Sequence, residues 1–310
     1  MVAAEILERV AIASAVRDIE KNAPAGVYRR PYHAARGHHV KGEFHFGAKR
    51  AKADRRPRVC EAIGFQAMAA SPSPPRLLPS GDSAITVEFS RNIDDAANER
   101  VLALDRALAR EPIGGVTETV PTYRSLLVHY DPLQIGFDAL SEQLAKLAQQ
   151  PMPPAADARR WRIPVVYGGE HGIDLEDVAK RLHTTPDDVV ARHVAGDYRV
   201  AMIGFTPGWS YLSGLEKFLH LPRRQDPRLL TPAGTVSIGG VQTGVQCLAG
   251  PSGWHLLGRT AVRTYQLHRD PIFLLEPGDR VTFARIDANT FAEQDRAAEA
   301  GEIIAELIAP

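Results

Sequence analysis

The sequence predicts an α+β protein in which an N-terminal α/β subdomain precedes a β-barrel. Two observations predict this fold class. Between residues 84 and 167, alternating and helically spaced apolar residues occur in the order β-α-β-β-α-β. After residue 198, short apolar runs separated by Gly and Pro predict regularly spaced strands with few helices. The first order is the split βαβ, or ferredoxin-like, pattern, and the second is typical of a closed or nearly closed barrel.

Length and composition are those of a globular protein with one to three domains. The 310 residues are 44% hydrophobic and 24% charged, which are ordinary values. The net charge is zero, so neither nucleic acid nor a membrane surface is expected as a partner. Cys60 and Cys247 lie far apart and need no disulfide, which fits a cytoplasmic protein. No apolar run is long enough to predict a transmembrane helix.

Residues 1–75 are predicted to be a basic extension and linker. Up to residue 70 they contain 4 Lys and 9 Arg against 2 Asp and 5 Glu, a net charge of +6. They end in AASPSPP, which has the composition of a linker. We expect a disordered extension, or an upstream start codon with Met68 as the true start. A basic or metal-binding arm is the alternative.

The N-terminal subdomain, residues 76–160, is predicted from its apolar spacing. Asp94 can cap a first helix, and Gly136 precedes a second, each with apolar residues on one face. Strands are predicted at Ala84–Phe89, Val116–Pro121, Ser125–Tyr130 and Arg162–Tyr167. The last of these closes the β-α-β-β-α-β pattern.

The barrel domain, residues 161–288, includes two predicted short helices, Asp174–Leu182 and Pro186–Ala195. A capping-box match from Thr290 to Glu293 predicts a C-terminal helix over residues 289–310, with its body at Phe291–Leu307. Outside the central stretch, strands are predicted at Tyr198–Ile203, Val262–Leu267, Ile272–Leu275 and Arg280–Ile286.

The central stretch from Gly204 to Gly258 is predicted to line a small-molecule pocket. It holds ten of the chain's 25 Gly, a residue used where the backbone needs positive φ or approaches another group closely. Short apolar runs between the glycines predict strands joined by tight turns. Two of the three Trp and several polar side chains lie on this framework, as a pocket requires. An all-β core with Gly turns is the alternative.

Two histidines and an arginine are candidates for chemistry. His255 and His193 can act as general bases, and Arg259 can hold a carboxylate or phosphate with two hydrogen bonds. The alternatives are a core or surface position for His255 and C-capping of a helix for His193. A local basic patch that suits an anion is predicted at Arg223, Arg224 and Arg228.

The loop around Gly240 is a candidate for substrate binding. Gln242 and Thr243 offer amide, hydroxyl and backbone N–H groups there, and a hairpin turn with a bulge is the alternative. We expect Gln242, Thr243, His255 and Arg259 to face one cavity, with Tyr211 on its wall and His193 near its rim.

Several blocks of the sequence resemble one family. They are GDSAITVEF, VPTYRSLLVHYDP, IPVVYGGEHGIDLEDVA, GFTPGWSYLSGL, PRRQDPRLLTPAGTVSIGGVQTGV and GPSGWHLLGRT, in this order between residues 77 and 286. They resemble the B subunit of bacterial 5-oxoprolinase, a family also known as sporulation-kinase inhibitor I or allophanate hydrolase subunit 1, with carboxyltransferase subdomains C and D.

The resemblance implies a cyclophilin-like barrel and a role in an enzyme complex. Together with a homologous C subunit and an A subunit, the chain would open the small substrate 5-oxoproline to glutamate, using ATP with Mg²⁺ shared with its partners. His255 and His193 would then be catalytic, no metal ligand is expected, and the chain alone would be inactive. Binding of the substrate is expected at Gln242, Thr243, Arg259, Tyr211 and Gly240.

Two further functions stay open from the sequence. The chain could be a binding protein that inhibits a sensor histidine kinase, docking through its Trp209–Tyr211 surface. It could also be a subunit of an allophanate or other amide hydrolase. The sequence contains neither a P-loop nor a nucleophile elbow, so an ATP site would be unconventional or shared, and a hydrolase acting alone is the least favoured of the three.

Overall fold

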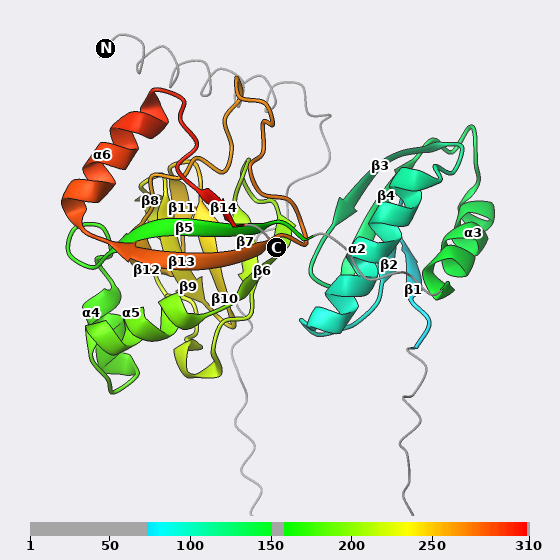
Figure 1. The fold of residues 1–310 in the computed structure, drawn as a ribbon. Coiled ribbons are helices and arrows are strands. Elements are labelled where there is room, and N and C mark those ends of the chain that lie inside the picture. The colour runs from blue at the N-terminus through cyan, green and yellow to red at the C-terminus, as the bar shows by residue number, and fades with distance from the viewer. Residues whose placement is uncertain (1–72, 151–157, 309–310) are drawn as a thin grey trace, which may run out of the picture. The chain divides into compact units, whose positions relative to one another are not determined.

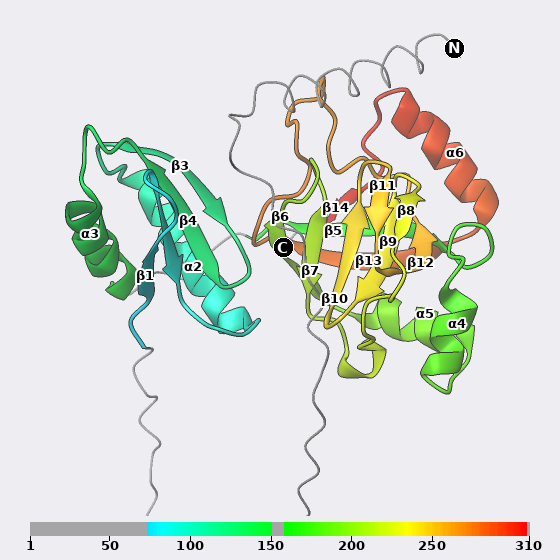
Figure 2. The ribbon, with the colours of Figure 1, turned by 180° about the vertical axis from the view of Figure 1, so that it is seen from behind.

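The computed structural model describes residues 73–150 and 158–308. Within them the fold is α+β, as predicted, with a four-stranded antiparallel sheet and a closed β-barrel (Figures 1 and 2). None of the helices found there combines the length and the apolar character needed to cross a membrane. The predicted basic extension lies outside the described residues, except for its last three.

The N-terminal sheet has the strand order β1-β2-β4-β3, with every neighbouring pair antiparallel. Its helices, α2 (Asp95–Arg110) and α3 (Phe137–Gln149), contact the sheet and each other. Their apolar stripes and the inward-facing residues of β2 and β4 form one core. The strands are β1 (Arg76–Pro79), β2 (Ala84–Glu88), β3 (Val116–Pro121) and β4 (Ser125–Tyr130).

One strand of the ferredoxin-like prediction was wrong. The predicted last strand, Arg162–Tyr167, belongs to the barrel as β5 (Arg160–Tyr167). The place beside β2 is taken by β1, which precedes the pattern in the chain. A four-residue strand gives almost no periodic signal, whereas the long apolar run of β5 gives a strong one without indicating which sheet it joins.

Seven described strands close into the predicted barrel. Their order is β12-β9-β10-β7-β6-β13-β5, and β5 pairs with β12 to complete the ring. The pair β5–β13 is parallel and the other neighbours are antiparallel. Apolar side chains fill the interior. The remaining bounds are β6 (Tyr198–Ile203), β7 (Ser210–Ser213), β9 (Thr235–Gly239), β10 (Gln242–Gln246), β12 (His255–Arg259) and β13 (Arg280–Ile286).

Short elements decorate the barrel. The ribbon of β8 (Arg228–Thr231) and β11 (Gly250–Ser252) forms a separate pair. The predicted strands at 262–267 and 272–275 are loops joined by the single bridge Tyr265–Phe273. The helical pieces are α4 (Leu175–Arg181), α5 (Pro186–Ala195) and the 3₁₀ turn η1 (Lys217–Leu219).

The C-terminal helix is shorter than predicted. Helix α6 spans Ala288–Glu299, and its N-cap is Asp287, whose carboxylate accepts from the backbone N–H of Thr290 at 2.9 Å. Gly301 follows with φ of 98°, a conformation that ends helices. The chain then forms β14 (Glu306–Ile308), which pairs with β5. Figure 1 shows α6 leaving the end of β13, which lies beside β5.

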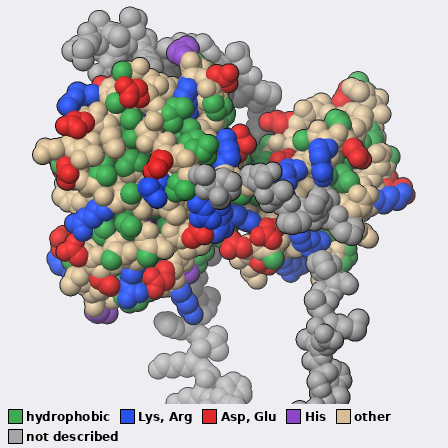
Figure 3. Space-filling model, in the orientation of Figure 1, with side chains coloured by type: hydrophobic (Ala, Val, Ile, Leu, Met, Phe, Trp, Pro, Cys, Tyr) green, Lys and Arg blue, Asp and Glu red, His purple; other side chains and the backbone are tan. Residues whose placement is uncertain are grey.

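Surface charge is mixed. On the face in Figure 3, basic and acidic side chains are interspersed on the barrel, with apolar side chains between them.

Candidate functional site

The glycine-rich strands form the wall and core of the barrel. Every residue of β9 and β10 is buried. A Cβ on Gly239 would lie 2.8 Å from the Trp254 ring, and one on Gly258 would lie 2.3 Å from the carbonyl oxygen of Val166. These glycines therefore let an indole and a neighbouring strand approach closely. Gly240, with φ of 66°, forms the β9–β10 hairpin turn, the alternative considered above.

Two of the predicted site residues meet inside the barrel. His193 on α5 and Thr243 on β10 are both fully buried. The Nε2 of His193 lies 2.9 Å from Thr243 Oγ1, and its Nδ1 lies 2.8 Å from the hydroxyl of Tyr167. Thr243 Oγ1 itself donates to the carbonyl of Ser237 at 3.0 Å. Because the hydroxyl proton of Thr243 is used there, Nε2–H donates to Oγ1 and the Tyr167 hydroxyl donates to Nδ1.

This buried chain of Tyr167, His193 and Thr243 is electrically neutral. Burial lowers the pKa of His193 to about 3 and raises the pKa of Tyr167 well above its ordinary value. The ring of His193 also stacks on Phe283 with centroids 4.7 Å apart. The expectation that His193 stands at the rim of a cavity was therefore wrong, because its ring is a satisfied part of the core.

The other predicted residues have hydrogen-bond and packing partners of their own. His255 Nε2 donates to the carbonyl of Pro222 at 2.9 Å. Arg259 Nε donates to the carbonyl of Ala233 at 3.2 Å, and its guanidinium lies over the Phe291 ring. Tyr211 packs against both Trp209 and Trp254, and Gln242 is buried at the start of β10. The roles assigned to these residues in binding and catalysis stay predictions.

Two arginines of the predicted basic patch pair with one carboxylate. Asp174, whose side chain is only 5% exposed, accepts from Arg228 at 2.6 and 2.8 Å and from Arg224 at 3.3 Å. It also accepts from the backbone N–H of Leu256. Arg223 lies over the ring of Trp254. Asp174 thus ties the loop to the barrel, and two of the three arginines already pair with a carboxylate.

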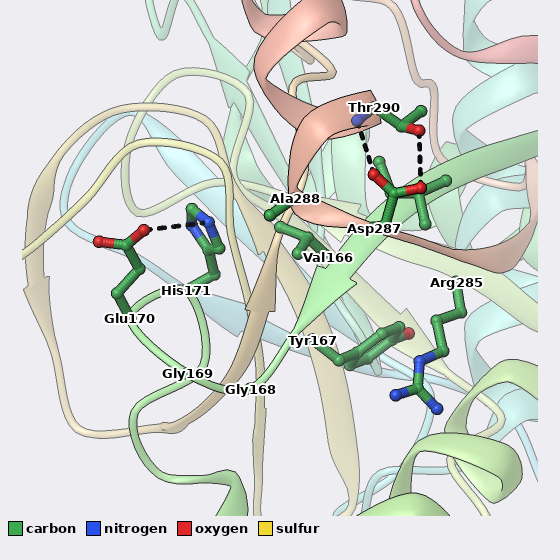
Figure 4. Close-up of a pocket in the computed structure, with 11 residues that line it drawn as sticks. Val166, Tyr167, Gly168, Gly169, Glu170, His171, Arg285, Asp287, Ala288 and Thr290 are labelled. Atoms are coloured by element: carbon green, nitrogen blue, oxygen red, sulfur yellow. Dashed lines mark hydrogen bonds and ion pairs between the residues drawn. The ribbon is translucent and has the colours of Figure 1, made fainter.

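A pocket of about 720 Å³ lies where β5 and β13 end. This volume is in the usual range for small-molecule sites. Figure 4 shows the turn after β5 on one side and the start of α6 on the other. None of the seven predicted site residues lines it. The lining residues are Val166, Tyr167, Gly168, Gly169, Glu170, His171, Arg285, Ile286, Asp287, Ala288 and Thr290.

The polar groups of this pocket have incomplete hydrogen bonding. The Nδ1 of His171 is buried and has no partner in the described residues, while its Nε2 lies 3.6 Å from Glu170. Arg285 is half-exposed and donates to Asp187 outside the pocket at 2.8 Å. Asp287 is the cap of α6. The described part of the chain contains no group of three or more His, Cys, Asp or Glu placed to hold a metal ion.

The sequence contained a signal for this pocket. The turn Gly168–His171 follows a buried strand directly, and both glycines have positive φ, 72° and 54°. A polar, glycine-containing turn at the end of a buried strand is a common position for binding groups. The second half, residues 285–290, could not be joined to it from sequence, because the parallel pairing of β5 with β13 is a long-range feature.

Comparisons with known proteins decide the family. Residues 75–275 match the family model described as "Carboxyltransferase domain, subdomain C and D". The chain is 36% identical over 222 residues to the B subunit of 5-oxoprolinase from Bacillus subtilis, covering 68% of this chain and 92% of that protein. The chain belongs to the family of 5-oxoprolinase B subunits.

Two solved structures match this chain over part of their own length. The crystal structure of TTHA0988 is 40% identical with a TM-score of 0.59, and the match covers 66% of this chain and 40% of that one. The urea amidolyase of K. lactis is 20% identical with a TM-score of 0.63, over 75% of this chain and 16% of that one. The second likeness concerns the fold alone. In both cases the match covers less than half of the other protein's chain.

Proposed function

We propose that the chain is the B subunit of an ATP-dependent 5-oxoprolinase, which opens the lactam of 5-oxoproline to glutamate together with A and C subunits. The observation that carries this proposal is the 36% identity across 92% of the Bacillus subtilis protein. A five-membered lactam is an unstrained amide, and coupling to ATP hydrolysis would supply the activation that its hydrolysis needs.

In this proposal the nucleotide and its Mg²⁺ are held by the partner subunits. The sequence has no P-loop, and the pocket is a poor fit for a triphosphate. Glu170 and Asp287 line it against one guanidinium, that of Arg285, which already faces Asp187. Like charges brought together in a cleft repel. The chain alone is therefore expected to be inactive.

An apolar patch on the barrel supports heteromeric assembly. Phe205, Leu248, Leu267, Ile272 and Phe273 are between 38% and 66% exposed. Hydrogen bonds hold their segments together. The backbone N–H of Tyr265 donates to Cys247 Sγ, Tyr265 forms a β-bridge with Phe273, and Thr264 Oγ1 donates to the carbonyl of Gly208. Clustered exposed apolar side chains mark interaction surfaces. We assign this apolar patch to the homologous C subunit.

Co-expression with the A and C subunits tests the proposal. The expected result is a co-eluting complex that releases glutamate from 5-oxoproline only when ATP is supplied, with no activity when this chain is omitted. Full activity of A and C without this chain would contradict the proposal.

A paired substitution tests the assembly surface. Leu267→Asp should abolish co-elution, because it places a charge in the apolar patch. Leu133→Asp is the matched control, since Leu133 is 95% exposed in the N-terminal subdomain and lies outside the patch. Equal loss with both variants would remove the assignment of the patch to the C subunit.

A further inference from the structure

We propose that the pocket between the β5 turn and the start of α6 binds a small molecule that carries an α-carboxylate beside an N–H group. An amino acid or its lactam has this chemistry. Naming 5-oxoproline and glutamate as the ligands rests on the proposed function, while the class of ligand follows from the pocket. The groups at the two sides of the pocket and the wall between them define this class.

Hydrogen-bond donors of the pocket suit a carboxylate. Arg285 presents a guanidinium that uses Nη1 for Asp187 and can offer its other N–H groups to a carboxylate. Arg285 is 57% and Asp187 81% exposed on the side chain, so this ion pair is weak and easily exchanged. His171 adds an acceptor: its Nε2 faces the Glu170 carboxylate, so the buried, unpartnered Nδ1 is the lone-pair nitrogen, which a turn of the ring toward a ligand N–H would satisfy.

Acceptors of the pocket suit an N–H group and limit the charge of the ligand. The side chain of Glu170 is 87% exposed, and its carboxylate oxygen lies 3.6 Å from Nε2 of His171. Asp287 uses both oxygens for Thr290 but retains further lone pairs. Two carboxylates against one guanidinium repel a dianion more strongly than a monoanion, so a phosphate group is disfavoured and a zwitterion or a monoanion is favoured.

The wall between these sides is held in place from within the barrel. Tyr167 donates its hydroxyl inward to His193, which is fixed in turn by Thr243. The hydroxyl is therefore occupied, and the ring of Tyr167 with Val166 and Ile286 gives the pocket an apolar surface. Such a surface fits the methylene groups of a lactam ring or of a glutamate side chain.

Calorimetric titration of the full chain, without its partners, tests this proposal. The ligands are 5-oxoproline, glutamate, inorganic phosphate and Mg–ATP. We expect saturable binding of 5-oxoproline or glutamate and none of phosphate or Mg–ATP. Tighter binding of 5-oxoproline assigns the pocket to the substrate, and tighter binding of glutamate assigns it to the product.

Three variants locate the binding. Arg285→Gln should weaken it about 10- to 100-fold, the effect of losing a hydrogen bond to a charged group, and His171→Phe about 3- to 10-fold, the effect of losing a neutral one. The Phe ring preserves the contact of His171 with Phe291, whose ring centroids lie 4.8 Å apart. Arg162→Gln is the matched control, because Arg162 also lies on a barrel strand, is 50% exposed and pairs with an exposed carboxylate, Glu306. It should bind as the parent does.

Several results would overturn the proposal. One is that neither 5-oxoproline nor glutamate binds at millimolar concentration. A second is binding that Arg285→Gln and His171→Phe leave unchanged. A third is that phosphate or Mg–ATP binds more tightly than 5-oxoproline and glutamate. Each can occur while the assay of the complete complex still gives ATP-dependent glutamate release, so a failure of the pocket is distinguishable from a failure of the proposed function.

Discussion

The glycine-rich strands β9, β10 and β12 and the turn at Gly168–His171 use glycine in different ways. In the strands, Gly239 and Gly258 leave room for an indole and a neighbouring backbone. In the turn, Gly168 and Gly169 supply positive φ beside a pocket. The strands, which are richer in glycine, thus pack the barrel, whereas the turn, which has two glycines, borders the pocket. A high glycine content can reflect close packing as well as a binding loop, so it does not locate a ligand site by itself.

The largest expected effect concerns packing in the strands. Gly258→Ala should destabilise the chain by about 3 kcal/mol or more, because its new Cβ would meet a backbone carbonyl that cannot move aside. Gly204→Ala is the control, since nothing lies within 4 Å of its Cβ, and it should change the free energy of unfolding by about 0.5 kcal/mol or less. Urea denaturation measures both. Similar values for the two variants would break the packing account of these glycines.

A smaller effect is expected from the buried chain of Tyr167, His193 and Thr243. Thr243→Val removes the acceptor of the His193 Nε2 proton and leaves that group buried without a partner, at a cost of about 1–3 kcal/mol. Thr243→Ser keeps the hydroxyl and should lose markedly less. If Thr243→Val left stability unchanged but abolished the activity of the complex, that result would support the substrate-binding role predicted for Thr243 from sequence.

The pH dependence of stability follows from the same chain. The pKa of His193 is about 3 in the folded protein and 6.5 in its ordinary state. Above pH 6.5 the ring is neutral in both states; below it, the unfolded chain binds a proton that the folded chain does not. Stability should therefore fall as the pH drops from 6.5 toward 3, with a limiting slope of about 1.4 kcal/mol per pH unit from this residue.

A variant isolates the contribution of His193. His193→Gln should show a shallower loss between pH 7.5 and 5.5 than the parent, measured by urea denaturation at each pH. Parallel curves would mean that His193 is accessible to protons in the folded state, as a catalytic base at a cavity would be.

Arg259 gives the smallest of these effects. Its guanidinium lies 5.2 Å from the Phe291 centroid and donates to Ala233, so Arg259→Ala should cost about 1 kcal/mol of stability. Activity of the assembled complex, measured well below the melting temperature, should change little. A loss of activity by about 2–3 kcal/mol without loss of stability would instead support anion binding by Arg259.

The sequence predicted the fold class and most elements because these depend on local patterns. Alternating apolar residues predicted β2 and β4, and helically spaced apolar residues predicted α2 and α3. The exchange of β1 for β5 in the first sheet was not predictable, since strand pairing depends on contacts far apart in the chain. The start of α6 was misplaced because Thr290–Glu293 resembled a cap, whereas the cap is Asp287, and its end was missed because Gly301, with positive φ, was not recognised as the stop.

The candidate site was harder to predict than the fold. Sequence identified His193 as a candidate base and Thr243 as a candidate binding group, and the structure brings them together. It could not distinguish a buried hydrogen-bonded pair from a catalytic one, because both need the same residue types. The pocket depends on the parallel pairing of β5 with β13, which brings the turn at His171 near Arg285 and Asp287.

The most direct test of the central claim is a map of backbone amide chemical shifts during titration of the ¹⁵N-labelled chain with 5-oxoproline. We predict the largest changes at residues 168–171 and 285–290, with small changes in β9, β10 and β12. The largest changes at residues 239–244 and 255–259, with little change around His171, would contradict the claim that the pocket beyond β5, rather than the glycine-rich strands, contacts the ligand.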